Sequence, residues 1–151
     1  MRCLLITTIA LSSLFPDAGS AALHEGKEAR DCFFNNTDRY AQEDCLFKKR
    51  QESDKKIDSL ISETNKRIKA NNLAPFNGKA DAKETSGEVY SRRFMAAQNK
   101  WKEYRDELCL AVATELDEDA YDYQLYIAQC QINLNQRHIE EINMMDLPSA
   151  S

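Results

Sequence analysis

FMAAQNKWKEYRDELC, from Phe94 to Cys109, contains the single tryptophan of the chain. Its apolar side chains recur at spacings of three and four residues, which is typical of one face of a helix: Phe94, Ala97, Trp101, Tyr104 and Leu108. We expect the rest of the domain to bury this face. Arg105 and Asp106 lie beside it and Cys109 ends it, so charge, aromatic surface and a thiol meet on one short segment.

Two other stretches have helical spacing and lack internal proline or glycine. One runs from Asp38 to about Ala70. The other begins near Asp119 and has a seam at strict spacings of three and four: Tyr121, Leu125, Ala128, Ile132, Asn135, Ile139 and Ile142. The central helix extends from about Glu88 to Ala113, and residues 71–87 form a linker before it. No alternating strand pattern occurs, so the sequence predicts an all-α fold, a small antiparallel three-helix bundle.

The two ends of the chain have a different composition. Residues 1–22 combine an apolar run with a small-residue end and predict a secretory signal peptide, so we expect an exported protein of the periplasm or extracellular space with no membrane span after cleavage. Residues 23–31 predict a flexible lead-in, residues 32–143 the helical domain, and residues 144–151 a disordered tail. Phe33 and Phe34 are expected at the edge of the core.

Four cysteines remain after removal of Cys3 with the signal peptide. An even number in an oxidising compartment predicts two disulfides, which three connectivities could satisfy. Across a hairpin that turns near Asp119, the helical rise brings Cys109 level with Cys130, which leaves Cys32 to pair with Cys45. No close pair of thiols suggests zinc or redox chemistry, so we expect structural staples.

The charge and the motifs exclude several functional classes. The formal net charge of −5 argues against nucleic-acid binding and is compatible with a basic partner. No catalytic motif is present, and His138 with Glu141 has no third residue to complete a metal site. Trp101, Tyr104, Arg105 and Asp106 are interpreted as framework, with Arg105 and Asp106 pointing in different directions. We therefore expect neither an enzyme nor a cofactor.

The pattern Ala97-Gln98-x-x-Trp101-x-x-Tyr104-Arg105-Asp106-x-x-Cys109 resembles the N-terminal domain family of the lysozyme inhibitor LprI. The resemblance covers residues 31–142 and includes the other three cysteines, while Ile57-Asp58 departs from the family's usual Leu-Asn. It implies a small exported bacterial helical domain of a family named for a member that inhibits lysozyme. It supplies no inhibitory residues, because the shared positions are those interpreted as core and staples.

Two functions follow from this resemblance and from the charge. The first is a binding protein that inhibits a basic lysozyme, with a run of acids as its contact surface: Glu115, Asp117, Glu118, Asp119 and Asp122. The same acids could instead serve only the N-terminus of the following helix. The alternative function is an envelope interaction or stress protein with no enzyme target. A small-molecule or metal binder is a third hypothesis.

Overall fold

The computed structural model describes residues 22–147, so the predicted signal peptide before Ala22 and the last four tail residues lie outside the described residues. The chain forms helices α1 (Lys27–Asn35), α2 (Arg39–Asn71), α3 (Ser86–Ala113) and α4 (Tyr123–Asn143), with a short 3-10 helix η1 (Phe76–Gly78) in the linker. Within these residues no strand is present beyond one isolated bridge. None of these helices is long and apolar enough to cross a membrane.

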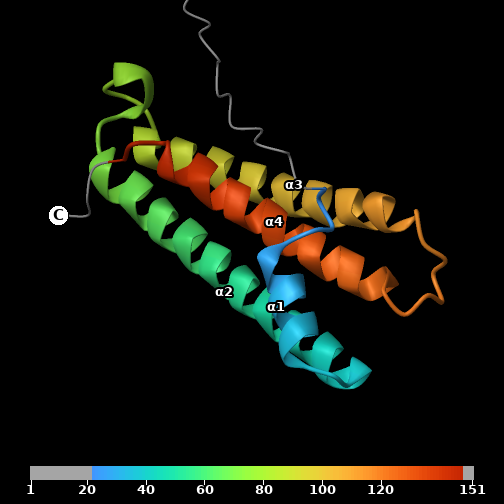
Figure 1. Ribbon diagram of the computed structural model, residues 1–151. Coiled ribbons are helices and arrows are strands. Elements are labelled where there is room, and N and C mark those ends of the chain that lie inside the picture. Colours follow the sequence, from blue (N-terminus) through green and yellow to red (C-terminus); the bar gives the residue numbers. More distant parts are fainter. Residues whose placement is uncertain (1–21, 148–151) are drawn as a thin grey trace, which may run out of the picture.

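The all-α class is confirmed, but the three-helix bundle is wrong because α1 is a fourth helix. Helix α1 covers residues 27–31 of the predicted lead-in and packs against α2 and α4. It contributes only Cys32 as a fully buried side chain, so it has no long apolar stripe that periodicity could detect. Figure 1 shows α1 beside the first half of α2, with α2, α3 and α4 as the long elements of the bundle.

The helix starts reflect local capping. Asp38 caps α2 by accepting a 2.9 Å hydrogen bond from the backbone nitrogen of Ala41. Thr85 and Glu88 form a reciprocal capping box at α3, and the hydrogen bonds from Thr85 lower the pKa of Glu88. Helix α4 begins at Tyr123 instead of near residue 119, so most of the acidic run lies in turns before the helix.

The core follows the predicted α4 seam and part of the predicted α3 face, in which Phe94 is buried and Trp101 and Leu108 pack against the core. Two seam residues, Tyr121 and Ile139, are partly exposed. The other five are buried: Leu125, Ala128, Ile132, Asn135 and Ile142. On α3, Ala97 is exposed and Tyr104 is 57% exposed, whereas Gln98 and Arg105 are buried. The buried face of α3 is therefore rotated toward two polar residues, Gln98 and Arg105. The spacing of apolar residues in the sequence does not reveal this rotation.

The linker and the tail are packed at the end of the bundle where α2 meets α3. Gly87 is buried, and its backbone nitrogen donates a 2.7 Å hydrogen bond to the carbonyl oxygen of Asn72. A Cβ at this position would lie 2.9 Å from that oxygen, so the close approach of the two helices requires glycine. Met145 and Leu147 pack against the cluster around Phe94, so residues 144–147 are not a frayed tail.

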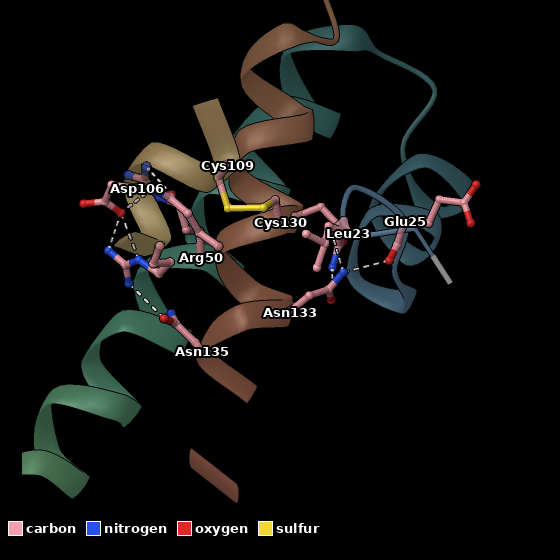
Figure 2. The surroundings of a disulfide bond; sticks show 11 residues. Leu23, Glu25, Arg50, Asp106, Cys109, Cys130, Asn133 and Asn135 are labelled. Atoms are coloured by element: carbon pink, nitrogen blue, oxygen red, sulfur yellow. Dashed lines mark hydrogen bonds and ion pairs between the residues drawn. A yellow bond between two sulfur atoms is a disulfide. The ribbon is translucent and has the colours of Figure 1, made fainter. Parts of the chain in front are cut away.

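Two disulfides and an N-terminal clamp cross-link the helices: one disulfide joins α1 to α2 and the other joins α3 to α4. Cys32 bonds to Cys45 and Cys109 bonds to Cys130, the pairing that the hairpin geometry predicts. One turn beyond Cys130, the side-chain nitrogen of Asn133 donates hydrogen bonds of 2.8 Å to the carbonyl oxygens of both Leu23 and Glu25 (Figure 2). The segment before α1 is therefore held against α4 rather than free.

Candidate functional site

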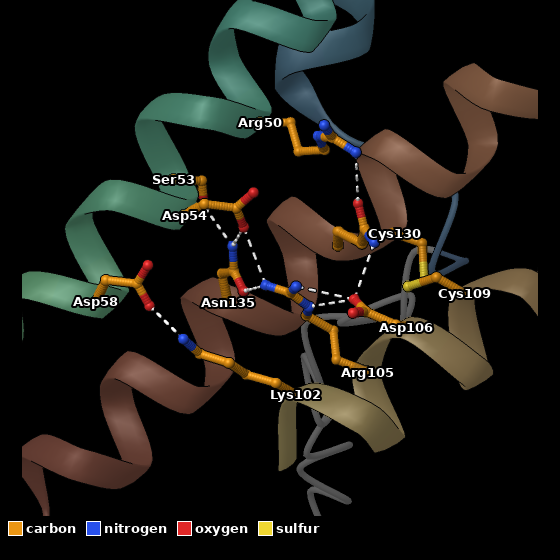
Figure 3. Close-up of polar contacts among 11 residues, drawn as sticks. Arg50, Ser53, Asp54, Asp58, Lys102, Arg105, Asp106, Cys109, Cys130 and Asn135 are labelled. Atoms are coloured by element: carbon orange, nitrogen blue, oxygen red, sulfur yellow. Dashed lines mark hydrogen bonds and ion pairs between the residues drawn. A yellow bond between two sulfur atoms is a disulfide. The ribbon is translucent and has the colours of Figure 1, made fainter. Parts of the chain in front are cut away.

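Arg105 and Asp106 of α3 belong to a buried network of hydrogen bonds that joins three helices (Figure 3). Arg105 Nη1 donates to Asn135 Oδ1 at 2.8 Å and to Asp54 Oδ1 at 2.9 Å. Asn135 in turn donates to Asp54 Oδ1 at 2.9 Å and to the Ser53 hydroxyl at 3.1 Å. The network thus connects the middle of α3 to α2 and α4.

Asp106 extends this network instead of pointing away from Arg105. Its Oδ1 accepts hydrogen bonds from Arg105 Nε at 2.9 Å and from Gln131 Nε2 at 3.0 Å. The prediction that these two neighbours diverge is therefore wrong, although each does contact another helix. Arg50 Nη1 continues the chain of contacts to Gln131 Oε1 at 3.3 Å. Every guanidinium nitrogen of Arg105 faces a protein acceptor, so none is left to bind a ligand.

Trp101 belongs to a second polar contact in the interior. Its ring stacks on that of His138 with the centroids 3.9 Å apart. His138 Nε2 lies 2.7 Å from Gln98 Oε1, and its Nδ1 lies 2.7 Å from a Glu141 carboxylate oxygen. In the part of the chain that the structure describes, no group of three or more histidine, cysteine or acidic side chains is placed to hold a metal. These contacts make Trp101 and His138 part of the packing between α3 and α4.

The acidic run lies on the connection between α3 and α4, outside this framework. Glu115, Asp117, Glu118 and Asp119 are exposed, and Asp122 is partly exposed. Backbone hydrogen bonds shape the connection as successive turns, among them Ala120 N to Asp117 O at 2.8 Å. Among residues 22–147, no ion pair involves any of these five acids. Their charges are therefore presented to solvent and available to a partner.

Tyr121 ties the acidic connection to the start of α2. Its hydroxyl donates a 2.8 Å hydrogen bond to Gln42 Oε1, and the Arg39 guanidinium lies 4.0 Å above its ring. Burial, together with the charge of Glu43, raises the pKa of Tyr121, so this hydroxyl keeps its proton at neutral pH. The acidic connection and the corner between α1 and α2 consequently form one end of the molecule (Figure 1).

Sequence reasoning misplaced the aromatic side chains at this end. Phe34 is 90% exposed, Tyr40 is 75% exposed and Phe33 is 40% exposed. The expectation that Phe33 and Phe34 sit at the edge of the core fails most clearly for Phe34. The missed signal is the spacing within α1, because Cys32 alone takes the buried position and its two neighbours must turn outward.

Comparison with protein families gives one match. A family model described as lysozyme inhibitor LprI matches residues 32–142, which is most of the chain. The match begins at the first disulfide cysteine and ends at buried Ile142, so it contains both disulfides, the buried network and the acidic connection. No curated protein and no solved structure matches significantly.

Proposed function

The chain belongs to the lysozyme inhibitor LprI family, and on that premise we propose that it is an exported protein that binds and inhibits a basic lysozyme. The observation that supports this proposal is the unpaired acidic connection of residues 115–122, held at one end of a disulfide-bonded bundle. A basic enzyme would be steered to such a surface, and the bundle behind it would cover the substrate cleft by its bulk.

The charge of the cleft limits how the acids can contact the enzyme. A lysozyme cleaves its glycan with two carboxyl groups inside the cleft. Carboxylates of the inhibitor would be repelled from that pair, so we place Asp117, Glu118 and Asp119 against basic side chains around the cleft. Inhibition then results from steric exclusion of the polysaccharide and needs no catalytic group from the inhibitor.

A muramidase assay tests the proposal. The mature protein is added in micromolar excess to a basic animal-type lysozyme at low salt, and the clearing of a cell-wall suspension is followed. We expect inhibition that weakens as salt rises, because exposed charge pairs are screened. No inhibition at any excess would rule out this function for that enzyme.

Charge reversal identifies the contact surface. The triple variant Asp117→Lys, Glu118→Lys, Asp119→Lys should raise the concentration needed for half inhibition by at least about tenfold. A matched variant, Asp81→Lys, Glu103→Lys, Glu140→Lys, changes the net charge equally at exposed positions away from the acidic connection. Equal losses in the two variants would mean that net charge, not this surface, governs binding.

The second candidate is an envelope interaction protein with no enzyme target. The same unpaired acids support it, because they suit any basic protein surface. In that case the protein does not inhibit lysozyme in the muramidase assay, but it still binds a different basic protein of the envelope in a salt-sensitive way. The two functions therefore separate on the enzyme assay.

A further inference from the structure

Three exposed aromatic side chains flank the turn that joins α1 to α2, two at the end of α1 and one at the start of α2; they are here called the aromatic corner: Phe33, Phe34 and Tyr40. They are three of the seven large hydrophobic side chains that are exposed in the described residues, and they fall within eight positions of sequence. Exposed apolar side chains that cluster, rather than scatter singly, mark interaction surfaces. The inference below rests on the proposed function and adds contact residues to it.

The aromatic corner is rigid before any partner binds. The Cys32–Cys45 disulfide, with a Cα separation of 5.7 Å, closes the turn immediately beside Phe33. Asn36 donates to the carbonyl oxygen of Cys32 at 2.8 Å, and its own carbonyl oxygen accepts a 2.7 Å hydrogen bond from Gln42. Because the backbone is already fixed, little backbone conformational entropy is lost when a partner buries these aromatic rings.

A hollow of about 420 Å³ adjoins the corner on the side of α4. Phe33 forms part of its wall, and the stacked rings of His24 and Tyr126, 4.1 Å apart, form another part. Glu25 and Arg30 lie on its lining as well. The surface therefore offers a projecting ring at Phe34 and, next to it, space for a partner's side chain, with one carboxylate and one guanidinium on the wall.

The distribution of charge identifies the chemistry of the partner. Residues 30–44, around the aromatic corner, contain four acids and two bases, and residues 114–122 contain five acids and no base. At the other end of the bundle, residues 66–93 contain seven bases and three acids. An anionic membrane or a nucleic acid would be repelled by the aromatic corner and its acidic surroundings, whereas a basic protein would be attracted.

We propose that Phe34, supported by Tyr40, is the apolar anchor of the interface with a basic lysozyme, and that the acids of residues 115–122 form the charged rim beside it. Interfaces of this kind concentrate their binding energy in a few aromatic side chains surrounded by polar groups. The Tyr121 contacts with Gln42 and Arg39 hold the anchor and the rim in one orientation.

The test is the dissociation constant of a purified basic animal-type lysozyme for the full mature protein and its variants, measured by biolayer interferometry at two salt concentrations. Phe34→Ala should weaken binding about 10- to 100-fold, mainly through faster dissociation, with the salt dependence unchanged. Tyr40→Ala should weaken it less. Reversal of Asp117, Glu118 and Asp119 should instead slow association and flatten the salt dependence.

Matched controls come from exposed apolar residues elsewhere. Leu73→Ala and Tyr104→Ala remove side chains that are 74% and 57% exposed, and both should change the dissociation constant less than about twofold. Circular dichroism of each variant checks the fold, which Phe34→Ala should leave intact because Phe34 is 90% exposed.

The outcomes separate the two proposals. If the unaltered protein inhibits lysozyme and Phe34→Ala binds equally well, the anchor is wrong and the inhibitory function stands. If the unaltered protein does not bind lysozyme, both are overturned. If sedimentation shows a dimer that Phe34→Ala dissolves, the aromatic corner binds a second copy of this chain, and the proposed anchor is likewise wrong.

Discussion

Arg105 Nη1 donates a 2.8 Å hydrogen bond to Asn135 Oδ1, and this bond joins the centres of α3 and α4 in the interior of the bundle. Asn135 is 0% exposed and Arg105 is 9% exposed. The same nitrogen reaches Asp54 of α2 at 2.9 Å. Burying a polar group without a hydrogen bond costs free energy. The hydrogen bonds of Asn135 and Arg105 therefore favour the one relative position of the three helices in which all of them form.

The first prediction is that Arg105→Met destabilises the protein by about 2–4 kcal/mol, because Asn135 loses a hydrogen-bond partner and Asp54 loses its cation. Methionine fills much of the same space, so the loss measures the polar contacts more than a cavity. Urea unfolding followed by circular dichroism gives the free energy of unfolding.

The matched control is Lys102→Met, one turn earlier on α3. Lys102 pairs with Asp58 at 2.6 Å, but both side chains are exposed, so its removal should cost less than about 1 kcal/mol. Equal losses for the two variants would contradict a special role for the buried network.

The sequence predicted the elements that depend on periodicity and chain length. Helices α2, α3 and α4 have uninterrupted helical spacing, and the short connection between α3 and α4 brings Cys109 level with Cys130. The family was also predicted from the sequence, because the motif around Trp101 has seven specified residues within thirteen positions. The exact start of α4 was not predicted, because acids suit either a helix N-terminus or an exposed turn.

The misplaced features depend on contacts between distant residues. Gln98 and Arg105 occupy the buried face of α3 because His138, Asn135 and Asp54 supply their hydrogen bonds. Those partners lie 30 or more positions away in sequence, so no local pattern reveals them. Helix α1 was missed for a related reason: it is held by one disulfide and by contacts to α2 and α4 rather than by an apolar stripe of its own.

The second prediction concerns the order in which the disulfides are reduced. Cys109 and Cys130 are both 0% exposed, whereas Cys45 of the other pair is partly exposed. Since thiol exchange requires access to a sulfur, Cys32–Cys45 should be reduced first. Timed reduction, alkylation and peptide mass spectrometry give the order, and simultaneous loss of both bonds would mean that reduction proceeds through global unfolding.

Each disulfide should also contribute separately to stability. The bonds close loops with sequence separations of 13 and 21, so replacing either pair with alanine should lower the free energy of unfolding by about 3 kcal/mol. Removing Cys32–Cys45 has a second effect, because it loosens the aromatic corner. Lysozyme binding should therefore weaken in the Cys32→Ala, Cys45→Ala variant even under conditions where circular dichroism shows that it is folded.

The third prediction is that Gly87→Ala destabilises the bundle by about 1–3 kcal/mol, although alanine is the better helix former. The added Cβ would lie 2.9 Å from the carbonyl oxygen of Asn72 and 3.1 Å from that of Lys69, both backbone atoms that cannot rotate away. Ser86→Ala, at the preceding position, adds no atom and serves as the control. A gain in stability for Gly87→Ala would show that α2 and α3 separate easily at this point.

The fourth prediction concerns Glu28 in the clamp between α1 and α4. Its carboxylate accepts hydrogen bonds from Gln129 at 3.0 Å and from Gln136 at 3.1 Å. Burial alone would raise the pKa of Glu28, but these hydrogen bonds outweigh that effect and the pKa lies below its ordinary value. A carboxyl group whose pKa is lower in the folded state stabilises the fold above its unfolded pKa, and this contribution is lost as the pH falls through the folded pKa.

Glu28→Gln removes this ionisation and should therefore lower the stability most at neutral pH. The difference in unfolding free energy between the unaltered protein and Glu28→Gln should shrink as the pH falls below about 4.3, the usual pKa of glutamate, because the unaltered side chain then becomes neutral as well. Urea unfolding between pH 7 and pH 3 measures this difference. Glu107→Gln, at an exposed α3 position without a hydrogen bond among the described residues, is the control. A difference that stays constant with pH would mean that Glu28 acts through shape rather than through its charge.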